Sequence, residues 1–199
     1  MNKKQLAIQL SKLDTLKNLK VNLEQYQTES ELAAELVWKA FMDGNIKNKT
    51  VADFGCGNGI LGIAALILQA KKVYFVDKDK EAIQTCKKNT QKYINTEFLN
   101  LEINNFNKKV DTVLMNPPFG VQNRKADKEF LIKAFETAEN IYSMHKIESE
   151  KFIEKICEEN NFTVLEIMEK EFTIKKIYKF HTKEKHQVKI AVWHLTKNI

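Results

Sequence analysis

Apolar residues near the start of the chain recur at helical spacing. Leucines stand three or four positions apart from Leu6 to Leu19, with lysine and glutamine between them, and a second amphipathic run covers residues 30–42. A repeat of about 3.6 residues is typical of a helix with one buried face. The pattern predicts two leading helices joined by residues 21–29, which form an N-terminal helical extension over residues 1–45.

From Thr50 onward, short apolar runs alternate with helical stretches. Parallel strands joined by crossover helices produce this alternation, and such sheets bind ligands at the carboxyl ends of their strands. The predicted strands are residues 51–54, 73–76, 97–99 and 110–115. The predicted helices are residues 59–70, 79–93, 127–140 and 149–160.

The last third of the chain has a different pattern. Residues 162–168 and 188–195 alternate or run apolar without a clear helix between them, so we expect an antiparallel pair of strands that closes the sheet. The fold class predicted is α/β, with a Rossmann-like, mostly parallel, seven-stranded sheet. The 199 residues fit a single domain, whose core is residues 49–199.

The charge balance is compatible with a polyanionic partner. Lys and Arg total 32 against 26 acidic residues, and the formal net charge is +6. Clustered basic side chains bind phosphates by releasing condensed counterions, although an ordinary mixed-charge surface explains this balance equally well. No signal-peptide pattern and no apolar run of about 20 residues occurs, so we expect a cytoplasmic protein with no membrane contact.

The three cysteines do not predict a metal centre or a disulfide framework. Cys56, Cys86 and Cys157 are odd in number and widely separated, which is typical of reduced thiols. Cys56 lies among glycines, but no partner histidine is evident, and we interpret it as a small packing residue rather than a nucleophile. His145 ends the apolar run 141–144 and is expected to be a capping or core residue.

A glycine-rich loop follows the first predicted strand. Its sequence, Gly55-Cys56-Gly57-Asn58-Gly59, leads directly into an apolar helix. Glycines allow a ligand to approach the main chain closely, and the absence of a Gly-Lys-Ser/Thr ending argues against a nucleoside triphosphate. Asp77 ends the next strand, where a carboxylate can accept hydrogen bonds from both hydroxyls of an adenosine ribose. These features leave a dinucleotide and S-adenosylmethionine as alternatives.

The segment that separates these alternatives is Asn116-Pro117-Pro118-Phe119, which follows the fourth predicted strand. An adenine amino group is a poor nucleophile because its lone pair is delocalised into the ring. The side-chain oxygen of Asn116 and the carbonyl of Pro117 can each accept one N6 hydrogen, and Phe119 can stack on an unpaired base. Pro117 and Pro118 restrict the backbone and remove two N–H donors, so these four residues are the predicted catalytic motif.

Together these motifs resemble the class I S-adenosylmethionine-dependent amino-methyltransferases. The segments LEQYQT at 23–28, DFGCG at 53–57, MNPPFG at 115–120 and YKFH at 178–181 are similar to those of the archaeal and eukaryotic methyltransferase-like protein 5 family, and the resemblance covers nearly the whole chain. It implies N6-methylation of one adenosine in small-subunit ribosomal RNA. For eukaryotic members it also implies a small zinc-binding activator subunit.

The family's cofactor contacts can be carried over by position. They fall on Gln25, Thr28, Gly55, Asn58, Ile60, Asp77, Glu102 and Ile103, and Cys56, Gly57 and Asn116 complete the predicted cofactor site. Glu102 is one methylene longer than the usual aspartate of the family. Position 58 varies among relatives, so we expect the backbone N–H of Asn58 to matter more than its side chain.

Basic and aromatic residues alternate before the last predicted strand. They are Lys175, Lys176, Tyr178, Lys179, Phe180 and His181. Such a pattern suits phosphate contacts and base stacking on RNA, although a solvated charged loop is an alternative.

The leading functional hypothesis is therefore an RNA adenine-N6 methyltransferase acting on small-subunit ribosomal RNA. Methylation of a glutamine side chain in a translation factor is an alternative, because that chemistry also uses Asn-Pro-Pro followed by an aromatic residue. A DNA adenine substrate is disfavoured by the lack of room for an extra recognition domain. A non-catalytic RNA-binding subunit with the same fold is the alternative from another class.

Overall fold

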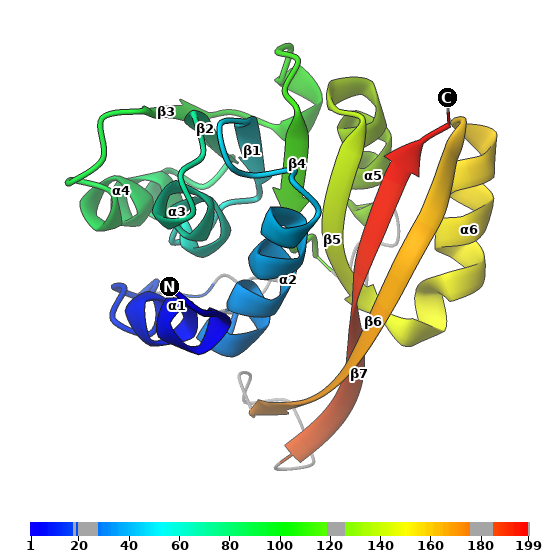
Figure 1. The fold of residues 1–199 in the computed structure, drawn as a ribbon, viewed down its shortest axis with the longest axis horizontal. Helices are drawn as coiled ribbons and strands as arrows, with labels where there is room; N and C mark the ends of the chain where they lie inside the picture. The colour runs from blue at the N-terminus through cyan, green and yellow to red at the C-terminus, as the bar shows by residue number, and fades with distance from the viewer. Residues whose placement is uncertain (18, 20–27, 119–125, 176–184, 199) are drawn as a thin grey trace.

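The structure, a computed structural model, describes residues 1–17, 19, 28–118, 126–175 and 185–198. A seven-stranded sheet in the order β3-β2-β1-β4-β5-β7-β6 runs through the molecule (Figure 1). The first five strands are parallel to one another, whereas β7 is antiparallel to both β5 and β6. The predicted mostly parallel sheet with an antiparallel C-terminal pair is therefore confirmed.

The strands are β1 Thr50–Phe54, β2 Lys72–Asp77, β3 Thr96–Asn100, β4 Thr112–Met115, β5 Asn140–Lys146, β6 Phe162–Lys175 and β7 Lys185–Lys197. The α-helices are α1 Lys3–Leu10, α2 Ser30–Met42, α3 Ile60–Ile67, α4 Lys80–Asn89, α5 Ala126–Thr137 and α6 Glu150–Glu159. The part of the chain that the structure describes also contains the short 3-10 helices η2 Ile103–Asn105 and η3 Ile147–Ser149. Among the described residues, no helix is long and apolar enough to cross a membrane.

Helices cover both faces of the sheet, and each layer has its own apolar core. The first core joins α1, α2, α3 and α4 to one face, with Leu36 of α2 and Ile63 of α3 buried against it. The second joins η2, α5 and α6 to the other face, with Leu131 of α5 and Ile153 of α6 buried there. Adjacent residues of a strand point to opposite faces, so a strand buried on both sides must be apolar throughout.

The first helix is shorter than its leucine spacing predicts. It ends at Leu10, and the hydroxyl of Ser11 donates a hydrogen bond to the carbonyl of Ile8. The prediction of a helix reaching Leu19 is therefore wrong. The backbone N–H of Asp14 instead bonds the side chain of Asn89 on α4, a tertiary contact that replaces the helical bond expected from local spacing.

The fifth parallel strand was not separated from its flanking helix by the sequence pattern. Residue 140, predicted as the last residue of a helix, is the first residue of β5, and α5 ends at Thr137. Along β5, Ile141 packs into the second core and Tyr142 into the first. A short strand that is buried on both faces shows no alternation, so periodicity alone does not identify it.

The last two strands are longer than predicted. Their backbone pairing continues to Lys175 and Lys185, well beyond the apolar residues that marked them, because ladder hydrogen bonds do not require apolar side chains. Within the pair, Trp193 of β7 is fully buried in the second core. A register shift between Val164 and Glu166 marks a bulge in β6, which is the edge strand.

Candidate functional site

The glycine-rich loop, Asp77 and Asn116 all lie at the carboxyl edge of the parallel strands. In the register of the sheet, Phe54 of β1 is paired with Val76 of β2 on one side and with Met115 of β4 on the other. The residues that follow these three positions, Gly55, Asp77 and Asn116, therefore leave the sheet at the same level. The arrangement expected from the sequence, with loop, acid and motif on one edge, is that of the structure.

The glycine-rich loop turns sharply out of β1. The backbone N–H groups of Gly55 and Cys56 both donate to the carbonyl of Val76, at 2.9 and 3.0 Å. Gly59 has a φ of 87°, and a Cβ at this position would lie 2.6 Å from the sulfur of Cys86. Only glycine combines this left-handed conformation with so close a neighbour, so the loop geometry depends on that residue.

The middle of the loop lies next to the acid at the end of β2. Among the described residues, a Cβ on Gly57 would meet nothing within 4 Å, and the Gly57 N–H donates to Asp77 Oδ2 at 2.9 Å. The N–H of Asp79 donates to Asp77 Oδ1, also at 2.9 Å. Each carboxylate oxygen has two lone pairs, so both oxygens retain acceptor capacity for ribose hydroxyls.

The position of Asp77 is fixed from β3 as well. The side-chain amide of Asn100 donates to the backbone carbonyls of Asp77 and Lys78, both at 2.9 Å. Burial raises the pKa of Asp77, against the two backbone hydrogen bonds that lower it. A half-buried carboxylate held in this way is suited to neutral hydroxyl donors, and nothing in the sequence pattern had indicated the contribution of Asn100.

A second carboxylate lies beneath the loop. Asp53 of β1 is only 1% exposed, and its Oδ2 accepts a hydrogen bond from the Gly62 N–H at 2.8 Å. The pKa of Asp53 is raised to about 7, chiefly by burial and also by the nearby charge of Asp77, while the Gly62 hydrogen bond acts in the opposite direction. Asp53 therefore joins β1 to α3 and keeps the loop between them in place.

Asn58 uses its side chain to hold the N-terminal extension. Its amide donates to the Asp14 carbonyl at 3.1 Å, and Asn89 at the end of α4 donates both to that carbonyl and to the carbonyl of Asn58, at 3.0 Å each. An exposed ion pair of 2.6 Å between Lys88 and Asp14 adds to the contact. The side chain of Asn58 is therefore engaged with the N-terminal extension.

Cys56 and His145 have the environments of packing residues. Cys56 is 4% exposed, and burial, followed by its neighbour Cys86, raises the pKa of its thiol well above the ordinary range. A thiol that resists ionisation is a poor nucleophile, which supports the packing interpretation. His145 lies in the core of β5, where burial lowers its pKa to about 3 and its ring contacts the Ser143 hydroxyl at 2.7 Å.

The predicted catalytic motif begins directly after β4. The side-chain amide Nδ2 of Asn116 lies 2.8 Å from the hydroxyl oxygen of Thr28, which precedes α2. Pro117 is buried and Pro118 is half-buried, so the motif is anchored at its start. Thr28 and Asn116, 88 positions apart in the sequence, thus come together at one point of the edge.

The remaining predicted site residues differ in burial, and several of them lie outside the described residues. Ile60 and Ile103 are buried, at the start of α3 and of η2. Glu102 is 63% exposed and lies 3.7 Å from the ammonium group of Lys78. The following predicted residues lie outside the described residues: Gln25, Phe119, Lys176, Tyr178, Lys179, Phe180 and His181. Lys175 is the last described residue of β6, paired with Lys185.

Within the described ranges, no group of three or more His, Cys, Asp or Glu residues is arranged to hold a metal ion.

Comparison with known proteins gives consistent matches. The family model of the methyltransferase small domain matches residues 25–146. An uncharacterized protein of Methanocaldococcus jannaschii is 33% identical over 99% of this chain and 95% of its own length. The rRNA N(6)-adenosine-methyltransferase METTL5 of Danio rerio is 32% identical over 96% of each chain.

Among solved structures, a crystal structure described as that of a candidate RNA methyltransferase from Pyrococcus horikoshii superposes with a TM-score of 0.94. The two chains are 41% identical, and the match covers 100% of this chain and 99% of the other.

Proposed function

Because the chain belongs to the methyltransferase small-domain family, and to its methyltransferase-like protein 5 group over nearly its full length, we propose that it methylates N6 of an adenosine in structured RNA. The methyl donor is S-adenosylmethionine. Small-subunit ribosomal RNA is the proposed substrate. The proposed location of the protein is the cytoplasm.

The observation that carries this proposal is the position of Asn116. Its side chain is held against Thr28 at the carboxyl edge, at the same level of the sheet as the glycine-rich loop and Asp77. The donor and the acceptor of a methyl group must lie next to each other, so a nucleotide-binding loop beside an amide and a proline carbonyl fits transfer to an amino group.

The binding half of the site is supplied by β1, β2 and their loops. Asp77 retains acceptor capacity for ribose hydroxyls, and no described residue would obstruct contact of the ligand with the main chain at Gly57, which supports the proposal. S-adenosylmethionine, when bound, supplies a methyl group on a positively charged sulfur. These residues bind and orient S-adenosylmethionine, and they take no part in proton transfer.

The catalytic half is supplied by the motif after β4. Asn116 Oδ1 and the Pro117 carbonyl accept the two N6 hydrogens, which favours a pyramidal nitrogen whose lone pair is directed at the methyl group. The extra proton on the methylated nitrogen remains hydrogen-bonded to these oxygens and then passes to water, so no strong base is needed. Phe119 is proposed to stack on the base.

RNA selection is proposed to lie outside this pocket. Every unpaired adenine presents the same edge, so contacts with the surrounding RNA must choose the site. The basic and aromatic residues from Lys175 to His181 are proposed for this role. We also propose that a small zinc-binding activator subunit binds this chain. Full activity of the purified chain alone would show that no such subunit is needed.

The test is single-turnover methylation by Asn116→Ala on ribosomal RNA. We expect a rate at least about 10²-fold lower with nearly unchanged cofactor affinity, the scale of losing one positioned hydrogen-bonding group. Asn107→Ala, at an exposed position that precedes β4 in the sequence, is the matched control. A normal rate for Asn116→Ala would overturn the catalytic assignment, and methyl transfer to a translation factor but not to RNA would overturn the substrate.

A further inference from the structure

Thr28 and Asn116 make a side-chain contact that links the N-terminal extension to the catalytic motif. The Thr28 oxygen accepts a hydrogen bond from Asn116 Nδ2 at 2.8 Å, and both side chains are half-buried. The side-chain amide of asparagine has a donor end and an acceptor end that differ only by a rotation of the terminal torsion. A hydroxyl can pair with either end, so the direction of the amide is given by which end donates or accepts: when the NH₂ donates to the hydroxyl, the carbonyl oxygen is directed elsewhere.

The direction of the amide matters for the proposed reaction. An adenine amino group offers hydrogens, so it must meet the carbonyl end of Asn116; the amide NH₂ would oppose it with a second set of donors. In the structure, the donor end faces Thr28 and the carbonyl end faces away from it. In this arrangement the hydroxyl of Thr28 acts as the acceptor and anchors the donor end of the amide, which is the orientation that the chemistry requires.

Thr28 can perform this role because the helix that follows it is firmly attached. Helix α2 buries Leu32, Leu36 and Val37 completely or nearly so against the first core. A helix packed along the sheet in this way keeps the residue at its start in a constant position relative to β4.

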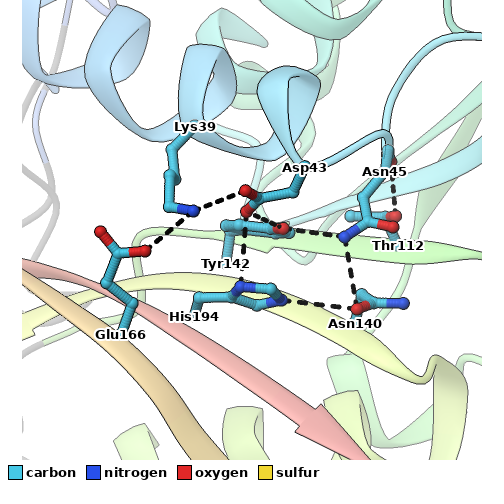
Figure 2. Close-up of polar contacts among 8 residues, drawn as sticks. All are labelled: Lys39, Asp43, Asn45, Thr112, Asn140, Tyr142, Glu166 and His194. Atoms are coloured by element: carbon cyan, nitrogen blue, oxygen red, sulfur yellow. Dashed lines mark hydrogen bonds and ion pairs between the residues drawn. The ribbon is translucent and has the colours of Figure 1, made fainter.

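The far end of α2 is attached by polar contacts (Figure 2). Asp43 accepts a hydrogen bond from the Tyr142 hydroxyl of β5 at 2.6 Å and pairs with Lys39 at 2.5 Å. Lys39 also pairs with Glu166 of β6 at 2.9 Å. In the figure, Lys39 and Asp43 point from the end of α2 toward the sheet, so polar contacts add to the apolar packing that holds the helix in place.

We propose that Thr28 is a positioning residue for methyl transfer, whose hydroxyl keeps the carbonyl oxygen of Asn116 directed at the adenine amino group. The inference rests on the proposed function. It differs from the cofactor contact that the family resemblance implies for Thr28, because a cofactor contact alone would change affinity and leave the saturated rate unchanged.

The test compares Thr28→Val, which keeps the shape of the side chain but lacks the hydroxyl, with Thr28→Ser, which restores it. Single-turnover rates are measured at saturating S-adenosylmethionine and RNA, and cofactor affinity by calorimetry, which also reports folding. We expect Thr28→Val to be about tenfold slower, the factor expected from loss of one neutral hydrogen bond, and Thr28→Ser to recover most of the rate. Thr85→Val on α4 is the matched control for loss of a threonine hydroxyl.

A double variant separates this inference from the proposed function. In an Asn116→Ala background, Thr28→Val should cause no further loss, because the group that Thr28 positions is gone. An equal tenfold loss in both backgrounds, or a loss of affinity without a loss of saturated rate, would overturn the positioning role. If Asn116→Ala is slow while Thr28→Val is normal, only this inference fails; if Asn116→Ala itself is normal, the proposed catalytic motif fails.

Discussion

Asn89 at the end of α4 donates a hydrogen bond of 3.0 Å to the main-chain carbonyl of Asn58 in the glycine-rich loop. The same amide donates to the carbonyl of Asp14, and its oxygen accepts the Asp14 N–H. One side chain thus connects the cofactor loop, a neighbouring helix and the N-terminal extension. A disturbance at Asn89 should reach the cofactor site although Asn89 itself was not predicted to belong to it.

We expect Asn89→Ala to weaken S-adenosylmethionine binding about fivefold to tenfold and to lower the free energy of unfolding by roughly 1–3 kcal/mol, because several hydrogen bonds are lost together. Calorimetric titration and urea denaturation measure the two effects. Lys88→Ala is the control, since it removes only the exposed ion pair with Asp14, which is worth less than about 1 kcal/mol. Equal behaviour of the two variants would show that Asn89 does not support the loop.

Asp77→Ala should weaken S-adenosylmethionine binding by at least about 100-fold, because two hydrogen bonds to a charged acceptor are each worth roughly 1.5–3 kcal/mol. The N–H groups of Gly57 and Asp79 also lose their acceptor, so some loss of loop order adds to the effect. The dissociation constant is measured by calorimetry, with thermal denaturation as the folding control. An unchanged constant in a folded variant would remove Asp77 from the cofactor site.

Asp53→Asn should change the pH dependence of stability. The folded pKa of Asp53 is about 7, above the value of roughly 3.9 for an unfolded chain, so the folded state binds more protons between these values. Its contribution to stability is therefore present below about pH 4 and is lost as the pH rises towards 7. Asparagine does not ionise, and its side-chain oxygen can still accept the Gly62 hydrogen bond.

Relative to wild type, the Asp53→Asn protein should thus gain stability as the pH rises, by up to about 1.4 kcal/mol per pH unit within this window. Urea denaturation of the cofactor-free proteins at pH 5 and pH 8 provides the comparison. Parallel stability curves for the two proteins would contradict the raised pKa.

Replacing Lys175, Lys176 and Lys179 together by alanine should weaken binding to ribosomal RNA and make it less dependent on salt, because fewer counterions are released when fewer phosphates are neutralised. Cofactor affinity should not change. RNA affinity is measured at several salt concentrations for both proteins. If affinities and slopes coincide, RNA recognition lies elsewhere, and the leading segment around Lys12, Lys17 and Lys20 is the next candidate.

The sequence alone was sufficient to predict the elements that have a recognisable local pattern of residues. The loop from Gly55 to Gly59, the acid Asp77 and the motif from Asn116 each follow a recognisable apolar strand, and the rule that parallel strands end on one edge brought them together. The antiparallel pair was predicted from the change in pattern, but its length was not, because backbone pairing continues where the side chains become charged.

What escaped prediction depends on contacts between distant positions. The spacing of Leu13 and Leu16 continues the helical pattern of α1, yet the helix stops at Leu10 because Asp14 bonds Asn89 instead. Likewise Asn100 and Asn89 have no distinctive neighbours in the sequence, and their importance comes only from the carbonyl groups that the fold places beside them.

The two tryptophans report separately on the two layers of the molecule. Trp193 of β7 is fully buried in the second core, whereas Trp38 of α2 is half-buried beside Phe41, with ring centroids 5.5 Å apart. Their intrinsic fluorescence should therefore differ in emission wavelength and in access to a soluble quencher. A Trp193→Phe protein would keep a spectroscopic probe on the helix that follows Thr28, so that detachment of this helix is recorded separately from unfolding of the sheet.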